Sequence, residues 1–178
     1  MRKLLVVIDY QNDFVTGALG FKKAEELENG IYKKVNEYLK SGDKVLFTYD
    51  THYDNYLETR EGKNLPVIHC TLGSLGHELY GKLKEFKERE NTIHLNKEAF
   101  GISPENMIKL REEFKEVESI ELLGIVSNIC LISNVVTFQS TFINSNIKVS
   151  GELSASFDEE LHTKALDVIE SLGVEVSR

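Results

Sequence analysis

Cys130 is the strongest candidate for a nucleophile in this sequence of 178 residues. It follows an apolar segment at residues 122–126 and a short turn, which predicts a place in the first turn of a helix. A helix N-terminus carries roughly half a positive charge. That charge would lower the pKa of the thiol and favour the reactive thiolate, while the free N–H groups could hold an oxyanion. The alternative is an inert cysteine of the core, the commoner fate of a lone cysteine.

Two charged residues at the ends of apolar segments could support that thiol. Lys97 follows residues 92–95 and could stabilise a thiolate and then an anionic intermediate. Asp9 ends the apolar run at residues 4–8 and could act as a general base, taking the thiol proton and passing it to a leaving amine. The alternatives are a solvated surface lysine and an aspartate that caps a loop.

A second group of residues has the chemistry of a metal site. Asp50 and His52 come just after an apolar run at residues 44–49, and His69 follows a polar loop. Two histidines and one aspartate suit Zn²⁺ or another borderline divalent metal, with water or substrate completing the shell. The alternative is two unrelated loop histidines. Cys70 is interpreted as a small core residue. The remaining histidines are interpreted as surface or packing residues: His77, His94 and His162.

The elements that must position these side chains alternate along the chain. Short apolar segments predict strands at residues 4–8, 44–49, 92–95, 119–126, 147–149 and 174–176. Segments of helical period lie between or after them, at residues 24–40, 75–86, 104–114, 130–142 and 158–172, and residues 50–73 are predicted as a loop. This alternation indicates an α/β fold, with a central six-stranded parallel sheet in a three-layer α/β/α arrangement. Active sites of such sheets lie beyond the carboxyl ends of the strands, so the candidate residues are expected on one rim.

Composition and charge exclude several classes of protein. Apolar residues make up 41% and charged residues 28%, with only two prolines, which excludes collagen-like and disordered chains. The net charge is −8 without a basic cluster, which argues against nucleic-acid and anionic-membrane binding. No apolar run approaches the ~20 residues that span a bilayer. The first apolar run, at residues 4–8, ends at Asp9 and is too short for a signal peptide. We expect a cytoplasmic protein with one domain over residues 1–178 and no disulfide.

Over essentially its whole length the chain resembles the isochorismatase-like cysteine hydrolases, and among them the nicotinamidase-type amidases. The matching segments come in order, each near a strand end: DYQNDF at 9–14, DTH at 50–52, HCTLGSLG at 69–76, KEAF at 97–100 and GIVSNIC at 124–130. The resemblance implies an isochorismatase-like, Rossmann-like fold and a catalytic triad of Asp9, Lys97 and Cys130. It also implies a divalent metal, Zn by preference, held by Asp50, His52 and His69.

The same resemblance implies how substrate is bound. Phe14, Val126 and Ser127 would line or orient the substrate, with a cis peptide between Val126 and Ser127 aiming a backbone N–H at the oxyanion. Metal-binding nicotinamidases usually carry Trp, Pro and an aromatic residue where this chain has Thr51, Tyr53 and Leu65, and this chain has no Trp. The usual aromatic clamp for a flat ring is therefore missing. Homo-oligomers, dimers or tetramers, are common in the family.

The implied activity is hydrolysis of a small amide to an acid and ammonia through a thioester, as in the conversion of nicotinamide to nicotinate. Isochorismatases proper lack the nucleophilic cysteine, so Cys130 favours amide over vinyl-ether hydrolysis. The alternative within the family is another small amide or a carbamoyl compound.

Two alternatives come from other classes of protein. A receiver-like phospho-acceptor domain would also use Asp9, Asp50 and Lys97, but receivers have adjacent acids after the first strand, where Tyr10 stands here, and they give Cys130 no role. A small-molecule binding or thiol-sensing protein would keep the fold without catalysis. A nucleotide-binding module is disfavoured because no G-x-G-x-x-G or Walker A loop follows the first strand.

Overall fold

The computed structural model describes residues 3–178, so residues 1 and 2 of the expected domain lie outside the described part. The strands are β1 (Lys3–Ile8), β2 (Lys44–Asp50), β3 (Thr92–Lys97), β4 (Ser119–Ile125), β5 (Asn146–Ala155) and β6 (Glu175–Ser177). The α-helices are α1 (Asn12–Val15), α2 (Lys22–Glu26), α3 (Glu28–Lys40), α4 (Arg60–Asn64), α5 (Pro104–Glu113), α6 (Ile132–Thr141) and α7 (Glu159–Ser171). Two 3₁₀ segments, η1 (Tyr56–Glu58) and η2 (Gly81–Phe86), and a π-helical turn, η3 (Ser127–Leu131), complete the set.

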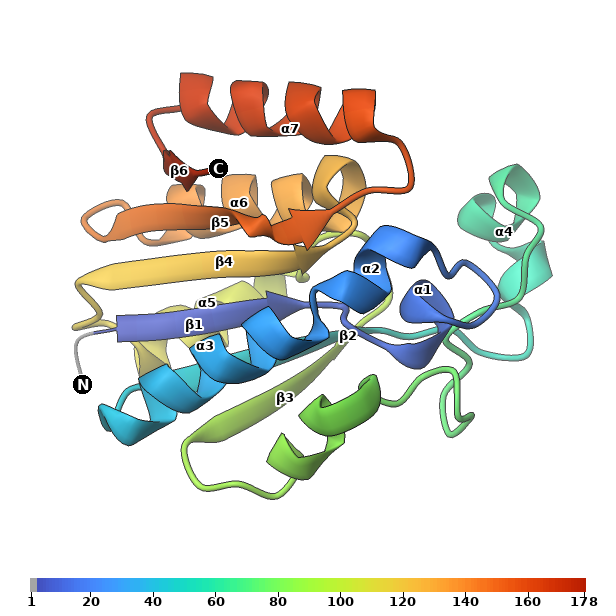
Figure 1. The fold of residues 1–178 in the computed structure, drawn as a ribbon, viewed down its shortest axis with the longest axis horizontal. Helices are drawn as coiled ribbons and strands as arrows, with labels where there is room; N and C mark the ends of the chain where they lie inside the picture. The colour runs from blue at the N-terminus through green and yellow to red at the C-terminus, as the bar shows by residue number, and fades with distance from the viewer. Residues whose placement is uncertain (1–2) are drawn as a thin grey trace.

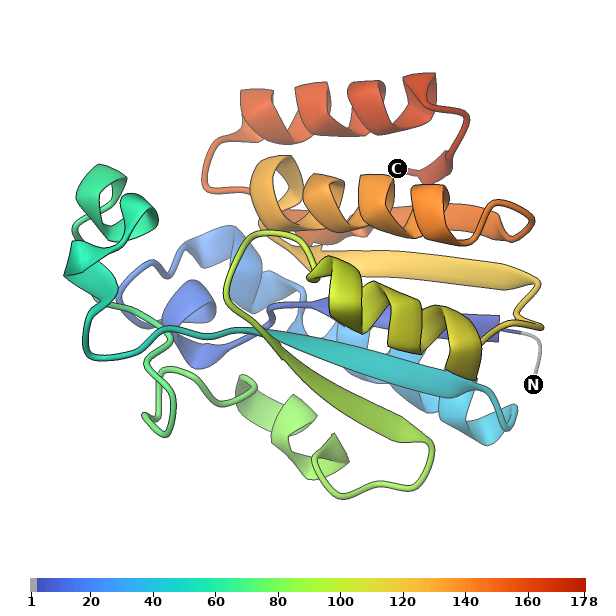
Figure 2. The same ribbon diagram turned by 180° about the vertical axis from the view of Figure 1, so that it is seen from behind.

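All six strands form one parallel sheet in the order β3-β2-β1-β4-β5-β6 (Figure 1), which confirms the predicted sheet. Helix α3 crosses one face in Figure 1, and the reverse view in Figure 2 shows α5 and α6 on the other. The expected three-layer α/β/α arrangement is therefore also confirmed. Within residues 3–178, no helix combines the length and the hydropathy that crossing a bilayer would require.

Strand β1 is apolar at every position from residue 4 to residue 8 because both faces of the strand are covered by helices. Leu4, Val6 and Ile8 pack into one buried cluster with α5, α6 and α7, whereas Leu5 and Val7 pack into a second cluster with α3. All five are fully buried. Side chains of a strand alternate between the two faces, so a strand between two helical layers must be apolar at every position.

The segment predicted as a helix at residues 24–40 is nearly continuous but is divided at Leu27 into α2 and α3. Leu27 keeps right-handed helical dihedral angles, and its carbonyl accepts a hydrogen bond from the Ile31 N–H at 2.9 Å. The helical period of residues 24–40 therefore predicted the helical segment correctly and missed a one-residue interruption.

The predicted helix at residues 75–86 is wrong in its first half, because only η2 is helical. The preceding backbone is bonded to the segment that follows β1. The Asp13 N–H donates to the Gly76 carbonyl at 3.1 Å, and the Tyr80 N–H donates to the Tyr10 carbonyl at 2.9 Å. Backbone groups that form these long-range hydrogen bonds cannot also form the hydrogen bonds of a helix. The spacing of apolar residues in the sequence does not show which of the two kinds of bond will form.

The other boundaries differ in ways that matter for the site. The polar stretch at residues 50–73 contains η1 and α4, and the Thr59 hydroxyl caps α4 by accepting a hydrogen bond from the Gly62 N–H at 3.0 Å. The helix predicted at residues 130–142 begins earlier, at Ser127, with the turn η3. Strand β3 extends to Lys97, so this lysine is the last residue of a strand.

Candidate active site

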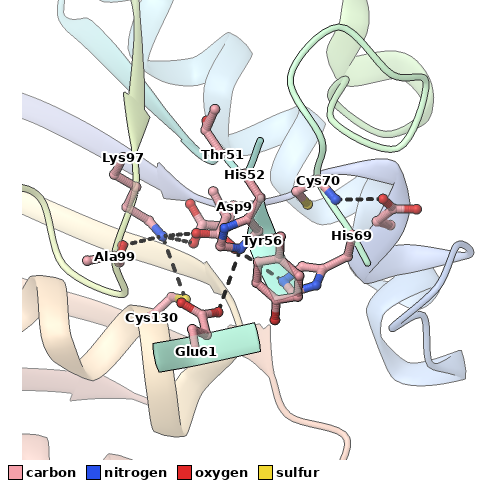
Figure 3. Close-up of polar contacts among 12 residues, drawn as sticks. Asp9, Thr51, His52, Tyr56, Glu61, His69, Cys70, Lys97, Ala99 and Cys130 are labelled. Atoms are coloured by element: carbon pink, nitrogen blue, oxygen red, sulfur yellow. Dashed lines mark hydrogen bonds and ion pairs between the residues drawn. The ribbon is translucent and has the colours of Figure 1, made fainter. Parts of the chain in front are cut away.

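The carboxyl ends of neighbouring strands bring the predicted catalytic and metal-ligating residues to one edge of the sheet (Figure 3). Asp9 directly follows β1, Asp50 ends β2, Lys97 ends β3, and Cys130 lies in η3 after β4. The loop that follows β2 supplies the two histidines, His52 and His69. All six side chains are buried.

The Lys97 ammonium group is the centre of this cluster. Its Nζ atom lies 2.7 Å from Asp9 Oδ2, 3.2 Å from Asp50 Oδ1 and 3.8 Å from Cys130 Sγ. It also donates a hydrogen bond to the Ala99 carbonyl at 3.1 Å. One buried cation therefore contacts the candidate nucleophile and two carboxylates.

Asp9 is held in an unusual backbone conformation, with φ at +48°. The Thr48 hydroxyl donates to Asp9 Oδ1 at 2.7 Å, and the Asp9 N–H donates to the Thr48 oxygen at 3.2 Å. Asp9 Oδ2 has its ion pair with Lys97, but it accepts no aligned hydrogen bond from residues 3–178. This oxygen therefore keeps the capacity to accept a proton.

The electrostatics of the cluster separate the roles of its members. Burial raises the pKa of Asp9 more than Lys97 lowers it, and the nearby Asp50 charge adds to the rise. For Asp50, burial is outweighed by Lys97 and the two histidines, so its pKa is lowered. Burial opposes protonation of Lys97, but the surrounding negative charges raise its pKa. Asp9 is therefore the carboxylate that most readily takes up a proton beside a charged lysine.

The sequence led us to expect a lowered pKa for the Cys130 thiol, and the structure corrects that expectation. Burial raises this pKa well above its ordinary value; Lys97 opposes the rise, and the Asp9 and Asp50 carboxylates add to it. The desolvation of a fully enclosed thiol outweighs the favourable charge of one lysine. The resting thiol keeps its proton, so a neighbouring base must remove it.

The two histidines and Asp50 come together as the sequence predicted. His52 Nε2 lies 3.0 Å and His69 Nε2 lies 3.5 Å from Asp50 Oδ2. His69 Nδ1 lies 2.7 Å from the Val67 carbonyl, a contact that requires a proton on Nδ1 and leaves Nε2 free as a ligand. Converging nitrogen and carboxylate donors of this kind fit a divalent metal such as Zn²⁺.

Glu61 belongs to the same group, and sequence reasoning missed it. One ligand atom from each of Asp50, His52, Glu61 and His69 lies within 4.8 Å of all the others. Burial and the Asp50 charge raise the pKa of Glu61, as expected for two crowded carboxylates that a cation would stabilise. The only signal in the sequence is Thr59, which caps the short helix α4 that carries Glu61.

A cavity of about 730 Å³ opens beside these two clusters. His52 and Glu61 form its wall toward the metal-ligating group, and Ala99 and Ile129 form its wall toward Lys97 and Cys130. Aromatic side chains also line it: Tyr53, Tyr56 and Phe100. The cavity is large enough for a small organic molecule, and it offers flat rings although the chain has no tryptophan.

The three predicted substrate-binding residues do not line this cavity. Phe14 is buried and packs edge-on against His69, with ring centroids 5.4 Å apart. Val126 and Ser127 are buried at the start of the turn η3 that carries Cys130, where the Ser127 hydroxyl lies 2.9 Å from His162 Nδ1. His162, which the sequence suggested to be a surface or packing residue, is therefore bonded to the turn that carries Cys130.

The cis peptide expected between Val126 and Ser127 lies one residue earlier, between Ile125 and Val126. Strand β4 ends at Ile125, so Val126 is the residue that leads the chain into the π-helical turn. The Val126 carbonyl accepts hydrogen bonds from the Ile129 and Leu131 N–H groups, each at 3.1 Å. These bonds fix the turn in which Cys130 lies.

Comparison with known proteins finds similar sequences and similar structures in one family. The family model described as "Isochorismatase domain" matches residues 3–178. The curated "Uncharacterized isochorismatase family protein PncA" of Bacillus subtilis is 27% identical, over 99% of this chain and the whole of that protein. The crystal structure of nicotinamidase/pyrazinamidase PncA from Bacillus subtilis superposes with a TM-score of 0.88 at 28% identity, over the whole of both chains. A pyrazinamidase/nicotinamidase from Streptococcus mutans gives a TM-score of 0.87 at 26% identity, covering 98% of this chain and 99% of that one.

Proposed function

This chain belongs to the isochorismatase family, and we propose that it is a cysteine amidohydrolase of the nicotinamidase type. It would hydrolyse a small amide, nicotinamide being the first to test, to the acid and ammonia. The observation that carries the proposal is the position of the Lys97 ammonium, 2.7 Å from Asp9 and 3.8 Å from Cys130 beside a cavity of about 730 Å³. Asp9, Lys97 and Cys130 are not among the lining residues of this cavity but lie directly behind Ala99 and Ile129, which are. In the proposed reaction, this nucleophile, base and cation act together on one bound carbonyl group.

In the first half of the proposed reaction, Asp9 takes the proton of the Cys130 thiol as the sulfur attacks the amide carbonyl. The raised pKa of Asp9 suits this step, because a weakly acidic carboxyl group both accepts and returns a proton. Lys97 and the backbone N–H groups of the turn η3 stabilise the negative charge on the carbonyl oxygen. Asp9 then protonates the amide nitrogen, the C–N bond breaks, ammonia leaves, and a Cys130 thioester remains.

In the second half, a water molecule attacks the thioester carbonyl while Asp9 accepts one of its protons. The C–S bond breaks, the acid leaves, and Asp9 returns its proton to the Cys130 sulfur. Lys97 stays charged throughout, since the surrounding carboxylates raise its pKa. The same three side chains therefore serve both halves of the cycle.

Asp50, His52 and His69, together with Glu61, are the residues that we propose to hold a divalent metal. Their mixture of imidazole nitrogens and carboxylate oxygens is the donor set that Zn²⁺ prefers. A bound metal would offer a coordination position to a donor atom of the substrate and so orient the amide toward the sulfur. His52 and Glu61 also line the large cavity, so a substrate bound there would lie beside the residues proposed to hold the metal.

The decisive experiment compares the two cysteines. We expect Cys130→Ala to abolish ammonia release from nicotinamide, and Cys70→Ala to retain it, with circular dichroism to verify that both variants fold. Rapid quenching of the wild-type enzyme followed by mass spectrometry of its peptides is expected to find the acyl group on Cys130. Equal ammonia release by Cys130→Ala and wild type would exclude Cys130 as the nucleophile.

A second candidate substrate class is a larger or more polar amide, or a carbamoyl compound. The cavity exceeds the needs of a single pyridine ring, and its wall includes polar side chains from Arg60, Asn64 and Glu98. Comparing turnover of nicotinamide, pyrazinamide, N-carbamoyl amino acids and simple aliphatic amides by ammonia release would rank the two classes.

The receiver-like alternative is disfavoured by the surroundings of Asp50. Its side chain is enclosed, and both of its oxygens are engaged, one with Lys97 and the other with His52. A phospho-acceptor aspartate must present a free oxygen to a phosphoryl donor, whereas both oxygens of Asp50 already have charged or hydrogen-bonding partners. Treatment with acetyl phosphate is therefore expected to leave the mass of the protein unchanged.

A further inference from the structure

A second cavity, of about 460 Å³, lies at the edge of the sheet formed by β2 and β3. Strand residues Tyr49, His94 and Asn96 form one side of it, and the loop from Leu72 to Leu79 and η2 form the other. It shares no lining residue with the cavity beside Cys130. Its volume lies within the roughly 300–1,000 Å³ that is usual for small-molecule sites.

The wall of this cavity contains three flat rings that are fixed in place. Tyr49 and His77 stack with centroids 5.4 Å apart and an angle of 29° between their planes. The Tyr49 hydroxyl lies 2.7 Å from His94 Nδ1, and Thr51 Oγ1 lies 2.9 Å from His77 Nε2. His94 also stacks on Phe47, with centroids 5.2 Å apart. Rings anchored in this way lose little freedom when a ligand binds, and a flat aromatic ligand can meet their edges or extend the existing stack.

The charged groups that line the cavity give it an excess of positive charge. Lys84 forms an ion pair with Glu78 at 3.6 Å. Lys87 also lines the cavity and, within residues 3–178, has no carboxylate at ion-pair distance. The ammonium of Lys87 is therefore available to a negatively charged ligand, and the Ser74 hydroxyl and Asn96 amide add hydrogen-bonding groups to the same wall.

We propose that this second cavity is a binding site for a small aromatic ligand that carries one negative charge, such as an aromatic carboxylate. The ring lies against Tyr49, His77 and His94, and the carboxylate pairs with Lys87. The proposal does not depend on the amidase function, because the two cavities are separate and binding is measured without turnover.

The absence of tryptophan supplies a direct binding assay, since an indole ligand is then the only indole fluorophore in the sample. The probe is indole-3-acetate, and indole-3-ethanol is its neutral counterpart. We expect saturable binding of indole-3-acetate and about tenfold weaker binding of indole-3-ethanol. Lys87→Ala is expected to weaken indole-3-acetate binding about fivefold. Lys82→Ala is the control, because Lys82 is an exposed lysine of η2 that does not line the cavity, and it should change the affinity less than about twofold.

Side-chain NMR of the five histidines locates the ligand. His77 and His94 lie in the second cavity, whereas His52 and His69 belong to the metal-ligating group. Binding as proposed shifts the ring signals of His77 and His94. Shifts confined to His52 and His69 would overturn the proposal, and so would equal affinities for the two indoles or for wild type and Lys87→Ala. These results would leave the proposed amidase function intact, because neither probe is an amide.

Discussion

Asp50 and Lys97 are direct partners in the register of β2 and β3, and Lys97 Nζ lies 3.2 Å from Asp50 Oδ1. The other carboxylate oxygen, Asp50 Oδ2, lies 3.0 Å from His52 Nε2. A single buried carboxylate therefore joins the Asp9–Lys97–Cys130 cluster to the metal-ligating group. The ends of two adjacent strands set this spacing, so the proposed catalytic and metal sites are built as one unit.

The first prediction concerns the cation at the centre of this unit. Lys97→Met leaves the Asp9 and Asp50 carboxylates without their shared cation, so we expect the free energy of unfolding to fall by about 3 kcal/mol. We expect kcat/KM for amide hydrolysis to fall roughly 10³-fold, because charge stabilisation at the carbonyl oxygen is lost. Urea denaturation and ammonia release measure the two effects.

Lys115→Met serves as the control for both measurements, since this lysine is exposed and, among residues 3–178, forms no ion pair or hydrogen bond through its side chain. Lys97→Arg tests whether charge alone is sufficient: it should recover part of the stability but little activity, because a guanidinium group does not fit the site of an ammonium. A Lys97→Met enzyme with activity within tenfold of wild type would contradict the proposed role.

The second prediction concerns the metal-ligating group. His69→Ala is expected to lower the affinity for Zn²⁺ roughly 100-fold and Glu61→Gln roughly tenfold, measured by competition with a chromophoric chelator. Glu58→Gln, an exposed carboxylate in the neighbouring segment η1, provides the matched control and should leave the affinity unchanged. Removing the metal is expected to abolish amide hydrolysis, and adding Zn²⁺ back should restore it. Full turnover by a verified metal-free enzyme would refute a catalytic role for these residues.

The position of the site could be predicted from the sequence because each chemical residue follows a recognisable strand. The ends of the apolar runs at residues 4–8, 44–49 and 92–95 predict that Asp9, Asp50 and Lys97 lie on one rim of the sheet. Parallel strands bring their carboxyl ends to one edge, so the order of elements determined the neighbourhood. The apolar, β-branched composition of these runs was enough to predict the strands from the sequence.

Glu61 and the state of Cys130 could not be predicted, for two different physical reasons. Glu61 reaches the site only because α4 forms in a polar stretch, and a five-residue helix depends on tertiary contacts rather than on its own periodicity. The pKa of Cys130 depends on how completely the thiol is enclosed, and a sequence does not give desolvation. The position of Cys130 at the start of a helix therefore does not determine the direction in which its pKa shifts.

The third prediction tests the close approach of β4 to β1 at Gly124. Gly124 has a φ of +121°, and a Cβ atom added to it would lie 2.3 Å from the carbonyl oxygen of Ile8. Ile8 is the residue that directly precedes Asp9. Gly124→Ala is expected to lower the free energy of unfolding by about 3 kcal/mol, because both the backbone and its neighbour must move. Gly42→Ala, at φ of +75° with nothing within 4 Å, isolates the backbone contribution and should cost about 1 kcal/mol. Equal losses in the two variants under urea denaturation would exclude the proposed clash.

The fourth prediction concerns Glu121, a largely buried carboxylate on β4 that is remote from the site. Its oxygens accept hydrogen bonds from Tyr38 and Ser150, and Lys34 lies 3.0 Å away. Burial opposes the charged form of Glu121, but these three partners outweigh it and lower the pKa below its ordinary value of 4.5. A carboxylate whose pKa is lowered on folding stabilises the protein fully above the unfolded pKa, and that stabilisation is lost as the pH falls through the folded value.

Glu121→Gln is therefore expected to lower the free energy of unfolding by about 2 kcal/mol at pH 7, because hydrogen bonds to a charged acceptor are replaced by weaker ones. The difference between wild type and variant should shrink as the pH is lowered below 4.5. Urea denaturation of both proteins between pH 3 and pH 7 measures that difference directly. Glu116→Gln is the control, because Glu116 is exposed and, within residues 3–178, forms no ion pair or hydrogen bond through its side chain. A difference that stays constant or grows toward low pH would show that Glu121 is not stabilised in its charged form.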